Sequence, residues 1–333
     1  MVDLSQRSEA HGGALDVMRE LFPSAPEPWI DLSTGINPWP WLATGWDDAP
    51  YRLPTETDQK RCVAAMAKVF GAPGQNILIG PGSELLIHLL PMLLRPRRVA
   101  VLSPTYADHA HVWRTSGCHV IETPTPLAEA RSCDMVVICN PNNPDGRRFD
   151  PATIEIARRH LSEHSGWLVI DEAFADLTPE LCSASCVVNG NLLVLRSAGK
   201  FYGLAGLRLG ALLGPPELLR RLAAHLGLWR VSTPALTVGA AAYEDCAWQT
   251  ATRQRLAKAR ERLDHLLAQT ECRVMGGTDL FRYVEVIDAD EVWRRLAEHG
   301  VYVRRFSWTN HHLRIGLPKD ATAETRLLDA LRG

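Results

Sequence analysis

The chain has 333 residues, of which 46% are hydrophobic and 22% are charged, and its formal net charge is −2. This composition excludes a disordered chain, and the nearly balanced charge argues against nucleic acid and membranes as partners. The most apolar stretch, residues 77–94, is interrupted by charge and proline, and the N-terminus has no apolar signal region, so we expect a soluble cytoplasmic protein.

Residues 1–45 differ from the rest of the chain in having many turn formers and little periodicity. This pattern predicts an N-terminal arm that lies over the body of the protein. From about residue 58, helical patterns alternate with short runs of Val, Ile and Leu. Helices are predicted over residues 58–70, 83–94 and 151–164, and strands over residues 76–80, 97–103, 118–123, 134–140, 167–172, 192–197 and 209–214.

Short strands that are apolar on both faces and separated by helices are typical of a mostly parallel sheet with helices on both sides. The predicted fold class is therefore α/β, with a large domain over residues 46–232. A long helical stretch follows, from about residue 235 to residue 270, and is expected to break near Cys246. The strands and helices after it predict a smaller α+β domain, residues 233–333.

Eight cysteines are scattered along the chain, and none of them forms a CxxC pair. In a chain without a secretion signal, this pattern predicts buried thiols rather than disulfides or a zinc site. We therefore expect no metal in this protein.

Ligands of open α/β sheets bind at the carboxyl ends of the strands, so the residues after each strand are the candidates for chemistry. Gly82, Ser83 and Glu84 open the helix that follows the first predicted strand. The free N–H groups of a helix N-terminus could bind a phosphate there. Taken alone, these residues are more simply explained as an ordinary strand-to-helix turn.

Three further predicted strands end in polar residues. Tyr106 follows the second strand and Asn143 lies in the turn after the fourth, although singly they suit a tyrosine at the core edge and a turn former. Asp171 closes a buried apolar run, and its desolvation is costly unless a cation or a strong donor meets it. A helix cap or an arginine partner would satisfy that need equally well.

Lysine is rare in this sequence, with five among 36 basic residues. Only Lys200 follows an apolar strand inside a glycine-flanked turn, and an amine there could form a Schiff base with an aldehyde cofactor. Asp171 could keep a pyridine nitrogen protonated. The turn at residues 80–84, with Ser197 and Arg208, could hold a phosphate. Together, these are the parts of a pyridoxal phosphate (PLP) site.

The motifs resemble those of the fold-type I PLP enzymes, the aspartate-aminotransferase superfamily. The matching stretches are Asn143-Pro144-x-Gly146, Asp171-Glu172-Ala173-Phe174, Ser197-x-x-Lys200 and residues 206–210. The resemblance implies a homodimer with the site at the interface and PLP as the cofactor, bound covalently by Lys200. It also implies Asp171 at the ring nitrogen, Asn143 at the phenolic oxygen, Tyr106 stacked on the ring, and Gly82, Ser83, Glu84, Ser197 and Arg208 around the phosphate.

A narrower likeness covers nearly the whole chain. The stretches His11-Gly12-Gly13 and 31–38 look like those of the threonine-phosphate decarboxylases of cobalamin biosynthesis, which are relatives of the histidinol-phosphate aminotransferases. The resemblance implies a small phosphorylated amino acid as substrate, with Arg314 at its carboxylate. The other candidates for substrate contacts are His11, Ile36, Asn37, Asn143 and Arg304, although His11 could also be an ordinary surface histidine.

Two positions depart from the usual aminotransferase pattern. Phe174 stands where many aminotransferases carry a tyrosine, as the likeness to the decarboxylases leads one to expect. Leu53 replaces a tyrosine that reaches the partner subunit's cofactor phosphate, so that contact is lost or is made by Tyr51 or Arg52.

The predicted function is PLP-dependent decarboxylation of L-threonine O-3-phosphate to (R)-1-amino-2-propanol phosphate. The alternative is an aminotransferase of the histidinol-phosphate type, which needs the same residues and also a keto acid. A non-catalytic PLP-binding protein is a third hypothesis, and the joint presence of Asn143, Asp171, Lys200 and Arg208 argues against it.

Overall fold

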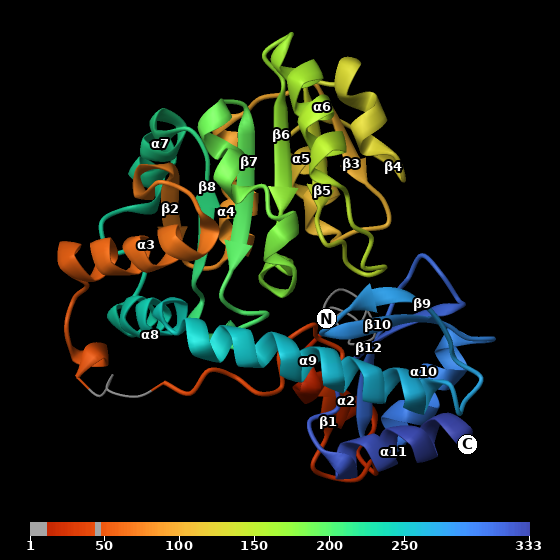
Figure 1. Ribbon diagram of the computed structural model, residues 1–333. Helices are drawn as coiled ribbons and strands as arrows, with labels where there is room; N and C mark the ends of the chain where they lie inside the picture. Colours follow the sequence, from red (N-terminus) through yellow and green to blue (C-terminus); the bar gives the residue numbers. More distant parts are fainter. Residues whose placement is uncertain (1–11, 44–47) are drawn as a thin grey trace. The chain divides into compact units, whose positions relative to one another are not determined.

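The computed structural model describes residues 12–43 and 48–333 (Figure 1). Packing divides the chain into two compact units. Unit 1 takes residues 144–146, residues 250–333 and the described part of residues 1–39, and unit 2 takes the rest. The three domains predicted from the sequence, residues 1–45, 46–232 and 233–333, stay a prediction.

Unit 2 is built around a seven-stranded sheet in the order β2-β8-β7-β6-β5-β3-β4. Strands β4, β3, β5, β6 and β7 run parallel to one another, and β8 is antiparallel to both β7 and β2. This confirms the α/β class with a mostly parallel sheet. The strands are β2 (Ile77–Gly80), β3 (Arg98–Leu102), β4 (His119–Thr123), β5 (Met135–Cys139), β6 (Trp167–Asp171), β7 (Leu192–Ser197) and β8 (Gly210–Leu213).

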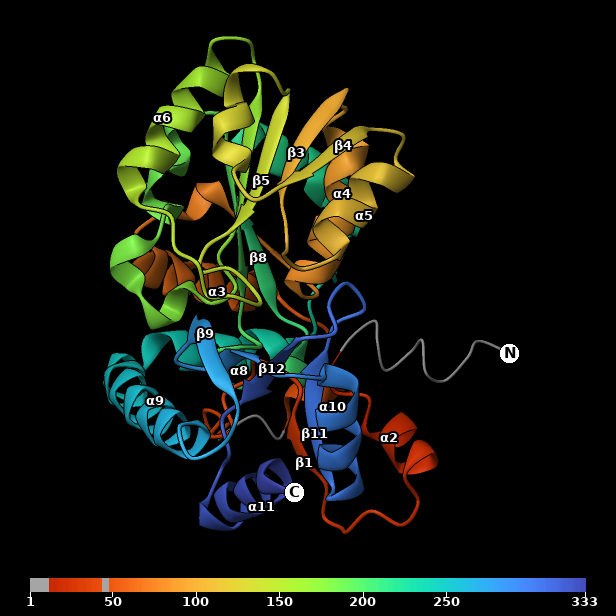
Figure 2. The ribbon, with the colours of Figure 1, turned by 90° about the vertical axis from the view of Figure 1, so that its right-hand side faces the viewer.

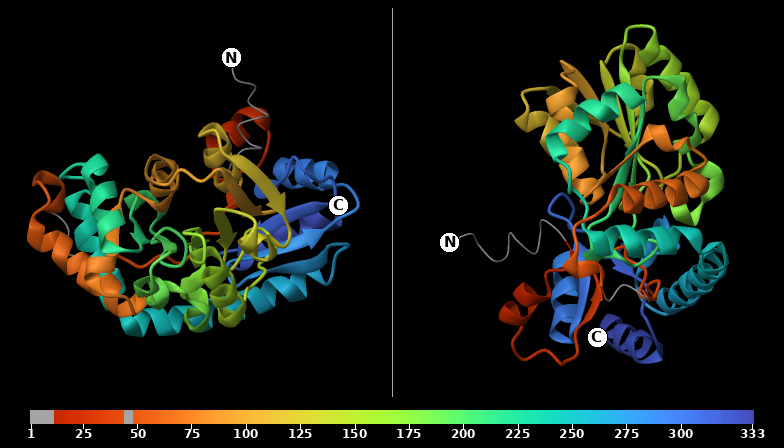
Figure 3. Two further views of the ribbon diagram at one scale, coloured as in Figure 1. Left: turned by 90° about the horizontal axis from the view of Figure 1, so that it is seen from above. Right: turned by 90° about the vertical axis from the view of Figure 1, so that its left-hand side faces the viewer.

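Helices cover both faces of this sheet. Figure 2 shows α6 on one face and the α4–α5 pair on the other. Helix α3 packs along α8 on the same side as α6, as Figure 3 shows. The helices of unit 2 are α3 (Glu56–Phe70), α4 (Ser83–Leu93), α5 (Asp108–Thr115), α6 (Pro151–Ser162), α7 (Pro216–Leu226) and α8 (Thr233–Glu244).

Local sequence signals explain where several of these helices begin and end. Asp150 caps α6 by accepting a hydrogen bond from the Thr153 N–H, and Pro151 occupies the first helical position. Gly71 ends α3 in the left-handed conformation that glycine adopts without strain. Pro91 lies inside α4, which ends two residues later at Leu93.

Unit 1 contains a five-stranded sheet in the order β1-β11-β12-β10-β9. Its first strand comes from the predicted N-terminal arm and pairs in parallel with β11, so this part of the arm belongs to a sheet. The long helical stretch breaks at Asp245, between α8 and α9, close to the predicted position. The elements are α2 (Leu15–Leu21), β1 (Ile30–Leu32), α9 (Cys246–Leu267), β9 (Arg273–Thr278), β10 (Phe281–Glu285), α10 (Ala289–Glu298), β11 (Val301–Arg305), β12 (His312–Gly316) and α11 (Ala321–Arg332).

All eight cysteines are free thiols. Cys62, Cys133 and Cys139 are buried as expected, whereas Cys118, Cys182 and Cys272 are only partly buried. The expectation is wrong for Cys186, in the 3₁₀ helix Ala184–Asn189, and for Cys246, at the start of α9, which are exposed. Among the helices of the described residues, none combines the length and the apolar character needed to cross a bilayer.

Candidate active site

The parallel strands of unit 2 bring several predicted site residues to one edge of the sheet. Strands β3, β5, β6 and β7 are neighbours that run in the same direction, so the loops after them leave from the same edge. Tyr106, Asn143, Asp171 and Lys200 lie in these loops or at the strand end. The fold therefore groups the four residues for which the sequence predicts contact with the cofactor ring.

A side chain next to Asn143 ties two of these loops together. The Thr105 hydroxyl donates to Asn142 Oδ1 over 2.7 Å, and Asn142 Nδ2 donates to the Pro104 carbonyl over 3.0 Å. Asn142 is completely buried, so both bonds are shielded from water. The loop that carries Asn143 is thus held against the loop that carries Tyr106.

Asp171, at the end of β6, is buried and is held by two hydrogen-bond partners. Its Oδ1 accepts from the Ala173 N–H, and its Oδ2 lies 2.9 Å from Nε2 of His109 on α5. The contact with His109 fixes the direction of the carboxylate. The partner is neither of the two that the sequence suggested, a helix cap or an arginine.

His109 is the residue of this site that sequence reasoning missed. It is 1% exposed, and its ring meets that of Tyr106 edge-on, with centroids 5.8 Å apart. The sequence feature that could have identified it is its position, three residues after Tyr106 and inside a helix that follows a strand end. Histidine on the buried side of a helix needs a polar partner, and Asp171 supplies it.

Lys200 lies in the turn after β7, beside Phe174. Its Nζ is 5.7 Å from the centre of the Phe174 ring, a residue without a hydroxyl that could donate or accept a hydrogen bond. The turn is closed by a bond from the Gly203 N–H to the Lys200 carbonyl. The buried rings of Phe201 and Tyr202 anchor the residues that follow.

The predicted phosphate site is built from backbone where β2 and β7 end and β8 begins. Gly80 and Ser197 both pair with Gly210, so the turn after β2 and the end of β7 flank the same residue. Gly82 precedes α4 with a φ of +87°, and a Cβ there would lie 2.9 Å from Arg208 Nη2. The glycine therefore leaves room for a guanidinium beside the N–H groups at the start of a helix, an arrangement that suits a phosphate.

Two side chains border this phosphate site. Arg208 Nη2 donates to Glu84 Oε2 over 2.9 Å, and both side chains are more than half exposed. Burial, followed by the neighbouring Asp108, raises the pKa of Tyr106, so its hydroxyl stays protonated at neutral pH. Gly82, Ser83, Ser197 and Arg208 thus lie close together within unit 2, and their binding of a phosphate stays a prediction.

Unit 1 holds the two predicted arginines side by side. Arg304 on β11 pairs in register with Arg314 on β12. Arg314 is buried and donates to the Ser33 carbonyl over 2.5 Å. Burial, and then the charge of Arg304, lower the pKa of Arg314 to about 9. Two neighbouring guanidinium groups are suited to binding an anion.

Residues of the predicted arm surround the same Ser33. The Gly13 N–H donates to the Ser33 hydroxyl, and a Cβ on Gly12 would meet the Ser33 carbonyl at 2.6 Å. Asn37 is buried and accepts from the Trp39 N–H, whereas Ile36 is half-buried. Ile36, Asn37, Arg304 and Arg314 therefore belong to unit 1, and His11 lies outside the described residues.

The residues around Leu53 differ in their exposure and in their partners within the chain. Arg52 is paired with Asp58 through two hydrogen bonds of 2.6 and 2.9 Å, and this pairing lowers the pKa of Asp58. Tyr51 is 87% exposed and Leu53 is 61% exposed. Of the two replacements considered for the missing tyrosine, Tyr51 is the more exposed, and Arg52 is already paired with Asp58.

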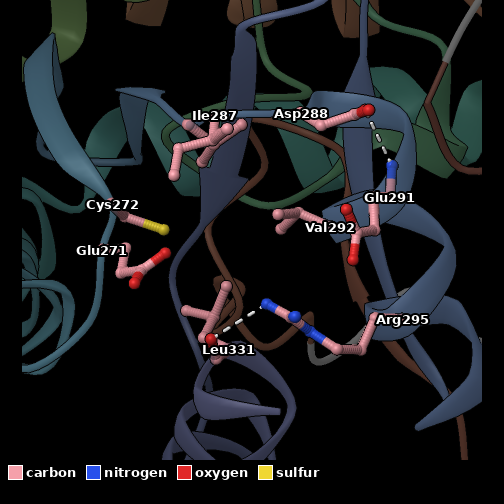
Figure 4. A pocket seen from close by; sticks show the side chains of 9 residues that line it. Glu271, Cys272, Ile287, Asp288, Glu291, Val292, Arg295 and Leu331 are labelled. Carbon is pink, nitrogen blue, oxygen red and sulfur yellow. Dashed lines mark hydrogen bonds between the residues drawn. The ribbon is translucent and has the colours of Figure 1, made fainter.

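A separate pocket of about 140 Å³ lies in unit 1 (Figure 4). Its polar groups are engaged in holding helices: Asp288 Oδ1 accepts from the Glu291 N–H, and Arg295 donates to the Leu331 carbonyl. We therefore assign no chemistry to it. The lining residues are Glu271, Cys272, Val286, Ile287, Asp288, Glu291, Val292, Arg295 and Leu331.

Known proteins resemble this chain in both sequence and fold. Threonine-phosphate decarboxylases of Pseudomonas aeruginosa and of a Sinorhizobium species are 40% and 37% identical to it, over 97% and 96% of this chain and 97% of each relative. A histidinol-phosphate aminotransferase of Desulfitobacterium hafniense is 28% identical over 83% of this chain and 82% of its own length.

The fold is shared with solved structures at lower identity. The histidinol-phosphate aminotransferase of Sinorhizobium meliloti, solved in complex with pyridoxal-5'-phosphate, is 18% identical, with a TM-score of 0.83 over 100% of this chain and 96% of that one. The family described as aminotransferase class I and II matches residues 52–331. This match and the similarity to the decarboxylases along nearly the whole length show that the chain belongs to the class I and II aminotransferase family.

Proposed function

We propose that this protein is a PLP-dependent decarboxylase that converts L-threonine O-3-phosphate into (R)-1-amino-2-propanol phosphate and carbon dioxide, a step of cobalamin biosynthesis. The observation that carries the proposal is the 40% identity to a threonine-phosphate decarboxylase over 97% of the chain. The arrangement of Lys200, Asp171 and Phe174 at one sheet edge supports it.

The residues of unit 2 fit this cofactor. Gly82, Ser83, Ser197 and Arg208 would hold its phosphate, because the glycine leaves the space beside Arg208 that a side chain would fill. Asp171, oriented by His109, would hold the ring nitrogen. When bound, PLP supplies an aldehyde that combines with an amine and a protonated ring that accepts the electron pair of a broken bond at Cα.

Lys200, Asp171 and Phe174 would each have a separate role in the reaction. Lys200 would hold the cofactor covalently, and its Nζ, once free, would be the group that returns a proton to Cα. Asp171 would bind the ring N–H, with its carboxylate held in place by the contact with His109. Phe174 leaves the phenolic oxygen to Asn143, because it has no hydroxyl to offer.

Substrate orientation decides which bond at Cα breaks. The bond that lies perpendicular to the ring is weakened, so decarboxylation requires the carboxylate to be held in that position. We assign this task to Arg314, with Arg304, Asn37, Ile36 and His11 as further contacts. Neighbouring guanidinium groups suit a substrate that carries both a carboxylate and a phosphate ester.

The decisive experiment supplies L-threonine O-3-phosphate and no keto acid, and assays carbon dioxide and the amino alcohol phosphate. We expect product over many turnovers. Threonine without the phosphate should react on the order of 10⁴-fold less well, because the donors built for the dianion would stay unpaired. Stoichiometric conversion of the cofactor to its amine form, with turnover only after addition of 2-oxoglutarate, would identify an aminotransferase instead.

We also propose that the protein is a homodimer. Tyr51, Leu53, Leu228 and Trp229 expose 87%, 61%, 78% and 61% of their surface. Two hydrogen bonds bring their segments together, from Thr233 to the Arg52 carbonyl and from Gln59 to the Leu228 carbonyl. An exposed apolar surface of this kind suits a second copy of the chain.

Sedimentation velocity tests the dimer. The wild-type protein should sediment as a dimer at micromolar concentration, and Trp229→Asp should shift it towards monomer, because a carboxylate would be buried at the contact. A fully active wild-type monomer would contradict the proposal.

The free thiols support the further inference that the protein works in the cytoplasm, where thiols stay reduced.

A further inference from the structure

A buried ion cluster lies on the face of the sheet that Asp171 does not use. Asp171 is in register with Leu195, and the Glu172 N–H donates to the Leu195 carbonyl. Successive residues of a strand point to opposite faces. The side chains of Glu172 and Arg196 therefore share one face, while Asp171 meets α5 on the other.

One guanidinium holds two carboxylates in this cluster. Arg196 Nη1 lies 3.0 Å from Glu172 Oε2, and Nη2 lies 2.6 Å from Asp176 Oδ1. The three side chains are 2%, 0% and 1% exposed. The ring of Phe70, at the end of α3, lies 4.4 Å from the guanidinium carbon and closes the cluster on that side.

The position of the cluster connects it to the candidate active site. Glu172 directly follows Asp171, and Asp176 lies two residues after Phe174, so the two carboxylates lie on either side of Phe174 and the first of them adjoins Asp171. Arg196 is on β7, four residues before Lys200. The guanidinium thus ties the loop after β6 to the strand that presents the lysine.

Stability alone does not account for such a cluster. Taking charges out of water is costly, and well-packed apolar side chains are often as stable as a buried ion pair. An ion cluster does fix geometry, because the planar fork of arginine bonds two acceptors at defined positions. Lysine, with a single ammonium group, cannot reproduce both contacts in the same place.

We propose that Arg196 is a positioning residue, which holds Glu172 and Asp176 and thereby sets the place of the Asp171 carboxylate relative to Lys200. The inference rests on the proposed function, in which Asp171 binds the ring nitrogen of PLP. A displacement of Asp171 would weaken the contact with that nitrogen and leave the bond at Lys200 and the phosphate contacts intact.

The test compares two ligands of the cofactor-free protein: PLP and its 1-deaza analogue, in which carbon replaces the ring nitrogen. Binding is followed by quenching of tryptophan fluorescence. Wild type should prefer PLP by roughly tenfold or more, since only PLP offers Asp171 a charged hydrogen bond. In Arg196→Lys we expect this preference to fall to about threefold or less, because small displacements cost a large part of such contacts.

Controls separate positioning from general destabilisation. Leu222→Ala removes a fully buried side chain on α7 and should lower the unfolding temperature while keeping the preference for PLP. Glu172→Gln serves as the second variant, and serves alone if Arg196→Lys does not fold, because the amide keeps the side-chain shape but replaces one acceptor by a donor. It should lose part of the preference.

A wild-type preference retained in Arg196→Lys or, where that variant does not fold, in Glu172→Gln would overturn the inference. Equal binding of both ligands by the wild-type protein would instead contradict the role proposed for Asp171. The two failures are therefore distinguishable.

Discussion

Replacing Lys200 with alanine should remove the visible absorption band of the bound cofactor and reduce decarboxylation by at least about 10⁴-fold. The amine is the only group in this loop that can bond covalently to an aldehyde, and it also returns the proton to Cα. Both effects follow from the loss of the Lys200 amine, so the covalent binding of the cofactor and the turnover of the substrate should be lost together. The measurements are an absorption spectrum and a carbon dioxide assay on the same preparation.

The scarcity of lysine makes the control for this experiment simple. Lys258 is exposed on the long helix α9. The variant Lys258→Ala should therefore keep both the absorption band and the activity. Reduction of the wild-type protein with borohydride should fix the cofactor on Lys200, which peptide mapping can identify. A band that survives in Lys200→Ala would show that another amine holds the cofactor.

Replacing Arg314 with alanine should lower kcat/KM for the phosphorylated substrate roughly 10³-fold, because the carboxylate would lose both its charge partner and its orientation. The loss should appear in kcat as well as in KM, since orientation determines which bond breaks. Arg273→Ala, which removes an exposed arginine of the same unit, should leave the kinetics unchanged. An unaltered kcat/KM in Arg314→Ala would exclude the residue from the site.

The sequence predicted the parts of this protein whose signals are short in range. Runs such as 134–139 and 167–171 define buried parallel strands. Asp171 and Lys200 stand out because a charged group at the end of such a strand needs a polar partner or a ligand. Parallel pairing then brings these ends to one edge. The fold class, and the edge of the sheet at which Asp171 and Lys200 lie, could therefore be predicted from the sequence.

Contacts between distant segments could not be predicted in the same way. His109 and Asp171 are 62 positions apart, and their pairing depends on how α5 packs over β3 and β4. Arg196 is 24 residues from Glu172, and its role depends on which face of β7 its side chain takes. Single-residue patterns carry no information on such packing, so these partners emerged only from the fold.

The close approach of Gly82 to Arg208 limits how this protein can change in evolution. Any other residue at position 82 would have to adopt a φ of +87° and would also meet the guanidinium with its Cβ. Two penalties thus fall on a single mutation, and no second mutation in a neighbouring side chain removes the first of them. Of the residues proposed to bind the phosphate, Ser83, Ser197 and Arg208 can therefore change, whereas the glycine at position 82 must be kept.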